Sequence, residues 1–279
     1  MGSGEFMLVS VLTPCLENPQ ALAATLASIL TQCLPPDMQA ELIVLDGSCS
    51  PHCRREAERQ RQALQQRRWR LAVIARPARG IYDALNVALQ RSVGRWLQVL
   101  PAGDRYADPH SLMRLLAHAD QLQARHGTAP AAVFGQAWVE AARGRPRWLT
   151  PDPRVGSIQA WLQRMVPCHQ AVLFAGSWAR AHPYPETSRI YGDRPVMRAA
   201  LAASGPEAYL PLPVCRYRLD GLSSGLPDRQ ALQQRLADPA LGPAGRRVER
   251  IKAWLRRLLP AAAYPQLMRI RAAWLGWRC

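Results

Sequence analysis

Four short apolar runs alternate with helical patterns in the first hundred residues, and this alternation limits the fold more than any other feature. The runs cover 7–14, 40–46, 69–77 and 95–100, and aliphatic residues dominate each of them. The segments between them, 18–30, 51–68 and 81–93, have helical spacing or composition. Apolar strands that alternate with helices form a parallel sheet covered on both faces. The sequence therefore predicts a doubly wound, mostly parallel, Rossmann-like α/β domain.

The rest of the chain predicts a more varied second half. A helix is expected over 108–127, and a strand over 131–141 with antiparallel pairing as one option. The proline-rich segment 144–165 resembles a mobile loop beside an active site. A strand is expected over 168–178, a helix over 188–205 and a last strand over 208–219.

Three aspartates follow the apolar runs of the first half. Asp46 ends the second run, Asp83 follows the third, and Asp104 follows the fourth. Ligands of doubly wound folds bind beyond the carboxyl ends of the strands, so we expect the three side chains to converge on one crevice. Each also has an ordinary explanation, as a turn aspartate or as an acid favoured at a helix start.

The chain carries a formal charge of +16, and Lys252 is its only lysine. Codon bias in a GC-rich genome explains an arginine excess without any function. A functional explanation is an anionic partner, such as a nucleotide diphosphate, a phospholipid surface or a nucleic acid. A pI near 10.7 fits nucleic-acid binding, but much of the charge lies in the tail and no stacking-aromatic motif occurs. We therefore expect no nucleic-acid partner and keep that class as the alternative.

The last part of the chain, from Arg246, has a different character. It holds nine basic residues and one acidic residue, about half of the excess charge. Apolar residues recur there at helical spacing: Ile251, Trp254, Leu255, Leu258, Leu259, Leu267, Ile270, Trp274 and Trp277. Basic amphipathic helices with tryptophan bind membrane surfaces. We expect this tail to dock on an anionic membrane, at the inner face of the cell membrane.

Two further sequence features bear on the cellular location of the protein. Residues 7–15 are too short and lack the basic lead of a secretory signal, and no uncharged stretch approaches the roughly 20 residues of a spanning helix. The seven cysteines form no paired pattern. Cys49, His52 and Cys53 make a metal site conceivable, but reduced structural thiols in a cytoplasmic protein fit better.

Five segments resemble family 2 glycosyltransferases with the GT-A fold, in order and in spacing: SVLTPCLENPQALAATLASI, ELIVLDGS, RGIYDALNVAL, GRWLQVLPAGD and VPCHQAVLF. The similarity is greatest to the bacterial branch that builds polysaccharides and lipopolysaccharide. It implies a GT-A domain over 7–225, with a nucleotide-sugar half (7–105) and an acceptor half (106–225). A basic amphipathic helical tail follows over 226–279, and residues 1–6 resemble an expression tag.

The resemblance implies an inverting, metal-dependent hexosyl- or N-acetylhexosaminyltransferase that uses a nucleotide-sugar donor, with UDP preferred by analogy. By position, it makes Asp193 the catalytic base and Asp104 the ligand of Mn²⁺ or Mg²⁺. It assigns the nucleotide-sugar site to Thr13, Glu17, Asp46, Arg79, Asp83, Asn86 and Gly103. It assigns the acceptor side to His169, Gln170, Gly221 and Ser223. The implied acceptor is a saccharide or a lipid-linked saccharide.

Three positions depart from the family pattern and affect the expected metal affinity and donor preference. Ala102 and Gly103 stand where many relatives have a second acid, Pro101 replaces an asparagine, and Glu17 replaces another. A catalytically degenerate scaffold is therefore a further alternative. A dehydrogenase is disfavoured because no G-x-G-x-x-G follows the first strand. The oligomeric state is left open.

Overall fold

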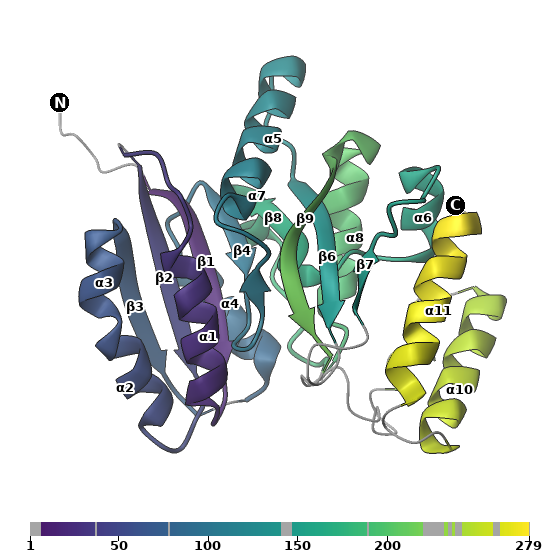
Figure 1. Cartoon of the computed structure of the whole chain (residues 1–279), viewed down its shortest axis with the longest axis horizontal. Coiled ribbons are helices and arrows are strands. Elements are labelled where there is room, and N and C mark those ends of the chain that lie inside the picture. Colours follow the sequence, from purple (N-terminus) through teal and green to yellow (C-terminus); the bar gives the residue numbers. More distant parts are fainter. Residues whose placement is uncertain are drawn as a thin grey trace.

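The computed structural model (Figure 1) describes residues 7–36, 38–77, 79–140, 147–188, 190–219, 232–233, 236–237, 242–258 and 263–278. Within these residues nine strands form one sheet in the order β3-β2-β1-β4-β8-β6-β9-β5, with β7 paired to β6. The strands are β1(Met7–Cys15), β2(Gln39–Asp46), β3(Trp69–Ala75), β4(Trp96–Val99), β5(Arg105–Tyr106), β6(Ala132–Glu140), β7(Arg147–Thr150), β8(Val172–Ala175) and β9(Tyr209–Arg218).

Helices cover both faces of the sheet, as the sequence predicts. They are α1(Pro19–Leu30), α2(His52–Arg59), α3(Arg61–Gln66), α4(Ile81–Arg91), α5(Ser111–His126), α6(Ile158–Arg164), α7(Gly176–Ala181), α8(Asp193–Ser204), α10(Pro243–Leu258) and α11(Ala263–Arg278), with short 3₁₀ helices η2(His169–Ala171) and η3(Pro206–Ala208). Residues of α1, α2, α3 and α5 join one buried cluster. Residues of α4, α7 and α8 join the other. The doubly wound α/β prediction is confirmed.

The first four strands pair in parallel, in the order β3-β2-β1-β4. Helix α1 begins where the sequence predicts, because the Asn18 side chain accepts a hydrogen bond from Ala21 N at 2.9 Å. This cap satisfies one of the amide groups that a helix start leaves without a partner. The carboxyl ends of these strands therefore meet at one edge, and β1 ends beside β2 with Cys15 opposite Asp46.

The prediction of a single helix over 51–68 is wrong, because the chain forms two helices there, α2 and α3, which meet at Gln60. The amide of Gln60 donates to Ala57 O at 3.1 Å, a tightened last turn of α2. This break lets Ala57 of α2 and Leu64 of α3 both lie fully buried against the sheet. Burial of both side chains outweighs one uninterrupted row of helical hydrogen bonds.

The continuous run of parallel strands ends at β4. Strand β8 is antiparallel to both β4 and β6, and β5 is antiparallel to β9. The antiparallel option for the strand near 131–141 therefore holds on its β8 side, while β6 pairs in parallel with β9.

The prediction of a mobile loop over 144–165 is wrong for the described part of that segment, which begins at residue 147. Residues 147–150 form β7 on the edge of β6, and 158–164 form α6. The Arg147 guanidinium lies 4.5 Å from the ring centre of Trp138 on β6, and Trp161 of α6 is buried. These contacts hold the segment on the sheet.

The tail contains helices α10 and α11; α11 contacts β7, and α10 lies on the far side of α11 in the view of Figure 1. Arg271 Nη2 lies 3.3 Å from Met165 Sδ, just after α6. Val248, Ile251, Trp254, Leu258 and Ile270 are exposed large apolar side chains. Leu259 of the predicted stripe lies outside the described residues. In the described part of the chain, no helix has the length and apolar character needed to span a bilayer.

Candidate active site

Asp104 lies directly after the loop that follows β4, and its carboxylate is nearly buried. Its Oδ2 accepts a hydrogen bond from Gln170 Nε2 at 2.7 Å, and its Oδ1 accepts one from the amide of Arg218 at 2.9 Å. Residues from three parts of the chain therefore meet at this carboxylate. Its position is fixed by β4, by η2 and by the end of β9.

Helix α1 clamps the loop that carries Asp104. The Thr25 hydroxyl donates to Asp104 O at 2.8 Å and accepts from Gly103 N at 2.9 Å. Gly103 has φ +102°, a conformation that L side chains rarely adopt. The departure at Gly103 from the family's acidic pattern therefore goes together with a backbone turn that favours glycine.

Asp193 is the first residue of α8 and comes within reach of two side chains from other elements. The Tyr82 hydroxyl donates to Asp193 Oδ1 at 3.1 Å, and His169 Nδ1 lies 3.9 Å from Asp193 Oδ2. Burial raises the pKa of Tyr82, and the Asp193 charge adds to the effect. Tyr82 therefore stays protonated and acts as a hydrogen-bond donor.

The other ring nitrogen of His169 has a different partner. His169 Nε2 lies 2.9 Å from the Tyr184 hydroxyl. Burial lowers the pKa of His169, and the nearby Asp193 carboxylate offsets part of that effect. Burial also raises the pKa of Tyr184. The neutral ring is thus held edge-on between Tyr184 and Phe174.

Two consecutive residues, His169 and Gln170, connect the two carboxylates. His169 faces Asp193, while Gln170 donates to Asp104. Burial, with contributions from both carboxylates, raises the pKa of the preceding Cys168 thiol to about 12. The segment that the family resemblance implies as an acceptor-side lining therefore contacts both Asp104 and Asp193.

Asp83 lies on the first turn of α4, as predicted, and pairs with an arginine. Arg76 Nη2 lies 3.0 Å from Asp83 Oδ2 and donates to Oδ1 at 3.2 Å. Arg79, which precedes the helix, is exposed.

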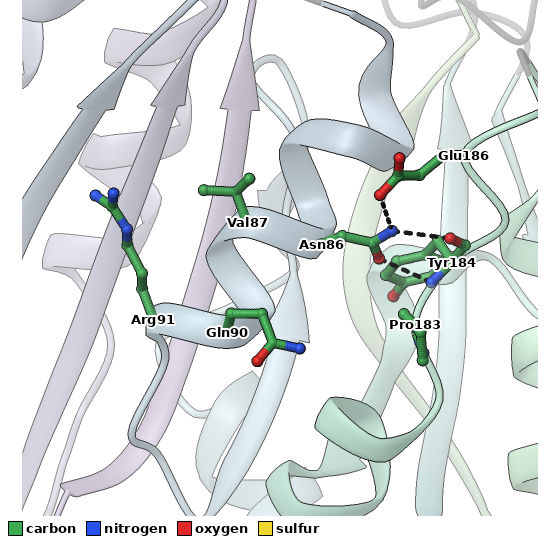
Figure 2. Close-up of a pocket in the computed structure, with 7 residues that line it drawn as sticks. All are labelled: Asn86, Val87, Gln90, Arg91, Pro183, Tyr184 and Glu186. Carbon is green, nitrogen blue, oxygen red and sulfur yellow. Dashed lines mark hydrogen bonds between the residues drawn. The ribbon is translucent and has the colours of Figure 1, made fainter.

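Asn86 binds the segment after α7 (Figure 2). Its Oδ1 accepts from Tyr184 N at 2.8 Å, and its Nδ2 donates to Tyr184 O at 2.9 Å and to Glu186 Oε1 at 3.1 Å. These three bonds brace an open pocket between α4 and residues 183–186. The side chain thereby positions the residue that contacts His169.

The side chains at the ends of β1 and β2 form a second group. Asp46 is 1% exposed, and its Oδ1 accepts from Ser48 N at 2.9 Å. Asp46 Oδ2 and Thr13 Oγ1 are buried without a hydrogen-bond partner. Glu17, at φ +48°, binds the 49–50 loop through Cys49 N at 2.6 Å and Ser50 Oγ at 2.6 Å. The hydrogen bond from the Ser50 hydroxyl is the main reason that the pKa of Glu17 is lowered.

Sequence reasoning missed three residues of the site, Tyr82, Tyr184 and Thr25. Tyr82 lies inside the quoted GIYDALN segment and could have been considered there. Tyr184 and Thr25 carry no comparable signal, because their roles depend on contacts between distant segments. Gly221 and Ser223 lie outside the described residues.

A cationic cluster lies next to Asp104. Three arginines surround the Glu140 carboxylate: Arg216 Nη1 at 3.0 Å, Arg105 Nη2 at 3.3 Å and Arg147 Nη1 at 3.8 Å. We use the name cationic cluster for Arg105, Arg147, Arg216 and Glu140, whose formal charges sum to +2. Arg105 directly follows Asp104, so the excess positive charge lies at the same edge of the sheet.

Comparisons with known proteins identify the family and the fold. The family described as Glycosyl transferase family 2 matches residues 10–174, more than half of the chain. Among solved structures, the S. aureus TarS 1–349 complex with UDP-GlcNAc has a TM-score of 0.59 at 14% identity, covering 90% of this chain and 72% of that one.

Mannosyltransferase PcManGT from Pyrobaculum calidifontis, in complex with GDP-Man and Mn²⁺, has a TM-score of 0.53 at 16% identity. That match covers 99% of this chain and 83% of the other. The chain spans 43% of the longer TarS structure. No curated protein matches the sequence significantly. The family match and the shared fold show that this chain belongs to glycosyl transferase family 2 and has the GT-A fold.

Proposed function

We propose that the protein transfers a sugar from a nucleotide-sugar donor to a saccharide or lipid-linked acceptor, with inversion at the anomeric carbon. The observation that carries this proposal is the connection of Asp104 and Asp193 through consecutive residues, His169 and Gln170. One carboxylate serves the leaving diphosphate and the other serves the attacking hydroxyl. A role in cell-surface polysaccharide or lipopolysaccharide synthesis follows from the resemblance of the sequence motifs.

Asp193 is the proposed general base. The acceptor hydroxyl must lose its proton as it attacks the anomeric carbon, and a positioned carboxylate contributes about 10²–10⁴-fold to such a step. Asp193 is about one quarter exposed, with a side-chain exposure of 23%. It is therefore open to an acceptor while Tyr82 and His169 restrict its orientation. Attack from the side opposite the diphosphate inverts the anomeric centre.

A divalent ion, Mn²⁺ or Mg²⁺, fits at Asp104 with one protein ligand. The Asp104 carboxylate accepts hydrogen bonds from Gln170 and from the Arg218 amide, and it is the kind of oxygen donor that Mn²⁺ and Mg²⁺ prefer. Ala102 and Gly103 provide no second acid, so phosphate oxygens and water must complete the coordination. When bound, the ion offsets the negative charge that develops on the diphosphate. The cationic cluster favours the same phosphates electrostatically.

The nucleoside end of the donor is proposed to bind where β1 and β2 end. Buried polar atoms without partners, Asp46 Oδ2 and Thr13 Oγ1, are available at this end of the sheet. Glu17 holds the loop above them, and the Arg76–Asp83 pair with Arg79 lies at the next strand end. The named complexes of the structural neighbours contain UDP, UDP-GlcNAc and GDP-Man, and UDP stays our preferred nucleotide. We propose that Asn86 acts indirectly, through Tyr184.

A binding panel and two variants test this assignment. The panel measures thermal stabilisation by UDP-, GDP-, dTDP- and CMP-sugars with Mn²⁺, because a ligand stabilises by RT ln(1 + [L]/Kd). Asp104→Ala should lose the Mn²⁺-dependent part of the stabilisation. Asp193→Asn should keep donor binding and lose turnover by about 10²-fold or more. Absence of stabilisation by every donor would favour a degenerate scaffold, and normal turnover of Asp193→Asn would require another base.

We also propose that the tail docks the enzyme on the inner face of the cell membrane, so that the site meets a lipid-linked acceptor. Ile251, Trp254 and Leu258 lie on one side of α10 and are exposed. Arginines flank them in the sequence, and each basic residue near an anionic leaflet contributes about 1 kcal/mol. The apolar side chains add to binding when they enter the interface.

Co-sedimentation with vesicles tests the docking. A variant with Trp254→Gln and Leu258→Gln removes two side chains that are 60% and 61% exposed, so the fold should be unaffected. We expect the wild type to bind anionic vesicles, to lose that binding in high salt, and to ignore neutral vesicles. The control Leu212→Gln changes an exposed leucine on β9 and should bind normally. Equal binding by both variants would contradict the proposal.

A further inference from the structure

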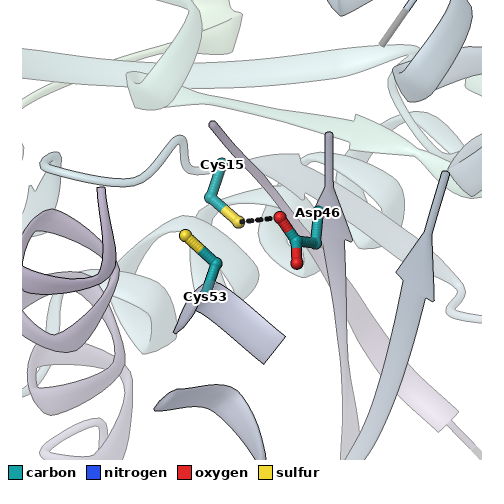
Figure 3. A group of neighbouring side chains, drawn as sticks. All are labelled: Cys15, Asp46 and Cys53. Atoms are coloured by element: carbon teal, nitrogen blue, oxygen red, sulfur yellow. Dashed lines mark hydrogen bonds between the residues drawn. The ribbon is translucent and has the colours of Figure 1, made fainter. Parts of the chain in front are cut away.

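Two cysteines and one aspartate meet at the ends of β1 and β2 (Figure 3). Cys15 is the last residue of β1, Asp46 is the last residue of β2, and Cys53 lies on the first turn of α2. The ligand atoms of these three side chains all lie within 4.8 Å of one another. In the described part of the chain, this is the one group of three or more His, Cys, Asp or Glu side chains with that spacing.

A second observation is the state of the Asp46 carboxylate. Asp46 Oδ2 is buried and has no hydrogen-bond partner, although Arg54 Nε lies 3.7 Å away. The Cys15 thiol donates to Asp46 Oδ1 over 3.9 Å. A buried carboxylate oxygen without a hydrogen-bond donor is destabilising unless a ligand satisfies it.

From these two observations we propose that Cys15, Asp46 and Cys53 form a site for a thiophilic divalent cation, Zn²⁺ in particular. Zinc binds thiolate and carboxylate ligands with tetrahedral geometry. Zn–S bonds of about 2.3 Å place two sulfur ligands roughly 3.8 Å apart. The three side chains therefore need to move together by no more than about 1 Å. Water completes the fourth position.

The binding step balances in atoms and charge. Zn²⁺ replaces the protons of the Cys15 and Cys53 thiols, and two protons pass to solvent. Asp46 binds through a carboxylate oxygen. The metal does not change oxidation state, so the step needs no oxidant or reductant. Magnesium and calcium favour six or more oxygen ligands and fit this donor set poorly.

The site has a functional consequence that rests on the proposed function. Asp46 is the side chain proposed to meet the donor nucleoside, so a zinc ion on Asp46 competes with the donor. Zinc would then inhibit donor binding from a position separate from the Asp104 metal. Cys15 and Cys53 are both needed for this inhibition, although neither is proposed to touch the donor.

Cobalt substitution on the reduced full-length protein, stripped of metal and without donor, tests the site itself. Co²⁺ should give a thiolate-to-metal charge-transfer absorption at one ion per chain, and Zn²⁺ should displace it. Cys15→Ser and Cys53→Ser should each lose the absorption and weaken Zn²⁺ binding at least tenfold. Cys33→Ser, a change at an exposed cysteine outside the site, should leave both unchanged.

Several results would overturn the proposal. They are the absence of the absorption in the wild type, its persistence in Cys53→Ser, or a Cys15–Cys53 disulfide that survives mild reductant. Asp46→Asn keeps both thiols and guards against misfolding of the serine variants, and it should weaken Zn²⁺ binding at least tenfold. Folding of all variants is checked by circular dichroism.

A second experiment distinguishes failure of the zinc proposal from failure of the proposed function. Donor affinity is measured with Mg²⁺ present, with and without Zn²⁺, in the wild type and in Cys53→Ser. We expect Zn²⁺ to weaken donor binding at least tenfold in the wild type and to have no effect in Cys53→Ser. Donor binding that Zn²⁺ leaves unchanged would overturn the competition. Absence of donor binding at any condition, together with a normal cobalt spectrum, would overturn the proposed function and support the site.

Discussion

Tyr82→Phe removes the hydroxyl that donates to Asp193 Oδ1 and leaves the buried ring in place. A hydrogen bond to a charged group contributes about 1.5–3 kcal/mol. The distance of 3.1 Å and the partial exposure of Asp193 favour the lower end of that range, about 1.5 kcal/mol. A difference of 1.4 kcal/mol is about tenfold in rate. We therefore expect kcat to fall about tenfold while donor affinity stays unchanged.

The assay is release of nucleoside diphosphate from the donor that the binding panel selects, with water or the saccharide as acceptor. A double-mutant cycle with Asp193→Asn isolates the interaction. If Tyr82 acts by holding the base, its loss should cost about tenfold with Asp193 present and almost nothing in Asp193→Asn. Tyr209→Phe removes a hydroxyl at the far end of β9 and is the control. Equal effects of Tyr82→Phe in both backgrounds would refute the reasoning.

Three other predictions concern stability. Asn86→Ala should lower Tm by several degrees, because it removes the side chain that binds the backbone N–H and C=O of Tyr184. The control is Gln90→Ala, which changes an exposed residue one turn along the same helix and should have little effect in the same thermal melts. Trp96→Ala leaves a cavity at a fully buried position and should lower the free energy of unfolding by about 3–5 kcal/mol, as measured by urea titration. A decrease below about 1 kcal/mol would contradict the packing of Trp96. Desolvation, aided by Arg271, lowers the pKa of Lys252 to about 8, because the folded state disfavours the charged amine. The unfolded chain therefore binds more protons at this residue, and the free energy of unfolding should rise as pH increases from about 8 to 10. Lys252→Met should lack that pH-dependent gain relative to the wild type, and parallel Tm profiles would disprove burial of the amine.

Much of the first half was predictable because its signals are local. The apolar runs and the cap at Asn18 correctly predicted β1, α1 and the parallel pairing of the first strands, but not their order. The local pattern placed Asp46 at the end of its strand and Asp104 after the loop that follows another strand, where the structure has them, but the convergence of the three aspartates on one crevice stays a prediction. The break at Gln60 was not predictable, because both helices have favourable composition and the break depends on how Ala57 and Leu64 reach the core.

The second half was less predictable because its pairing depends on strand partners that are distant in sequence. Strand β6 has β8 on one side and β9 on the other, in opposite directions. An apolar run does not encode direction, and a short segment such as 147–150 becomes a strand only when the edge of β6 is available. Residues of these strands alternate between two buried clusters, which a single apolar pattern does not separate.

The sequence by itself determined that this is an α/β chain of the family 2 type, with aspartates after its strands and a basic, amphipathic tail. Short-range spacing suffices for the α/β pattern and the amphipathic tail, because helix periodicity, caps and turns depend on neighbouring residues, whereas the family type came from the resemblance of five sequence motifs. The tertiary structure decided what the side chains do. It places His169 and Tyr82 beside Asp193, the proposed base, and lets Gln170 donate to Asp104. It also pairs Asn86 with the backbone of Tyr184 and brings Cys15, Asp46 and Cys53 together. Apart from Asp46 and Cys53, these contacts join residues more than twenty positions apart, and such contacts form only when burial of the two core layers fixes the strand order.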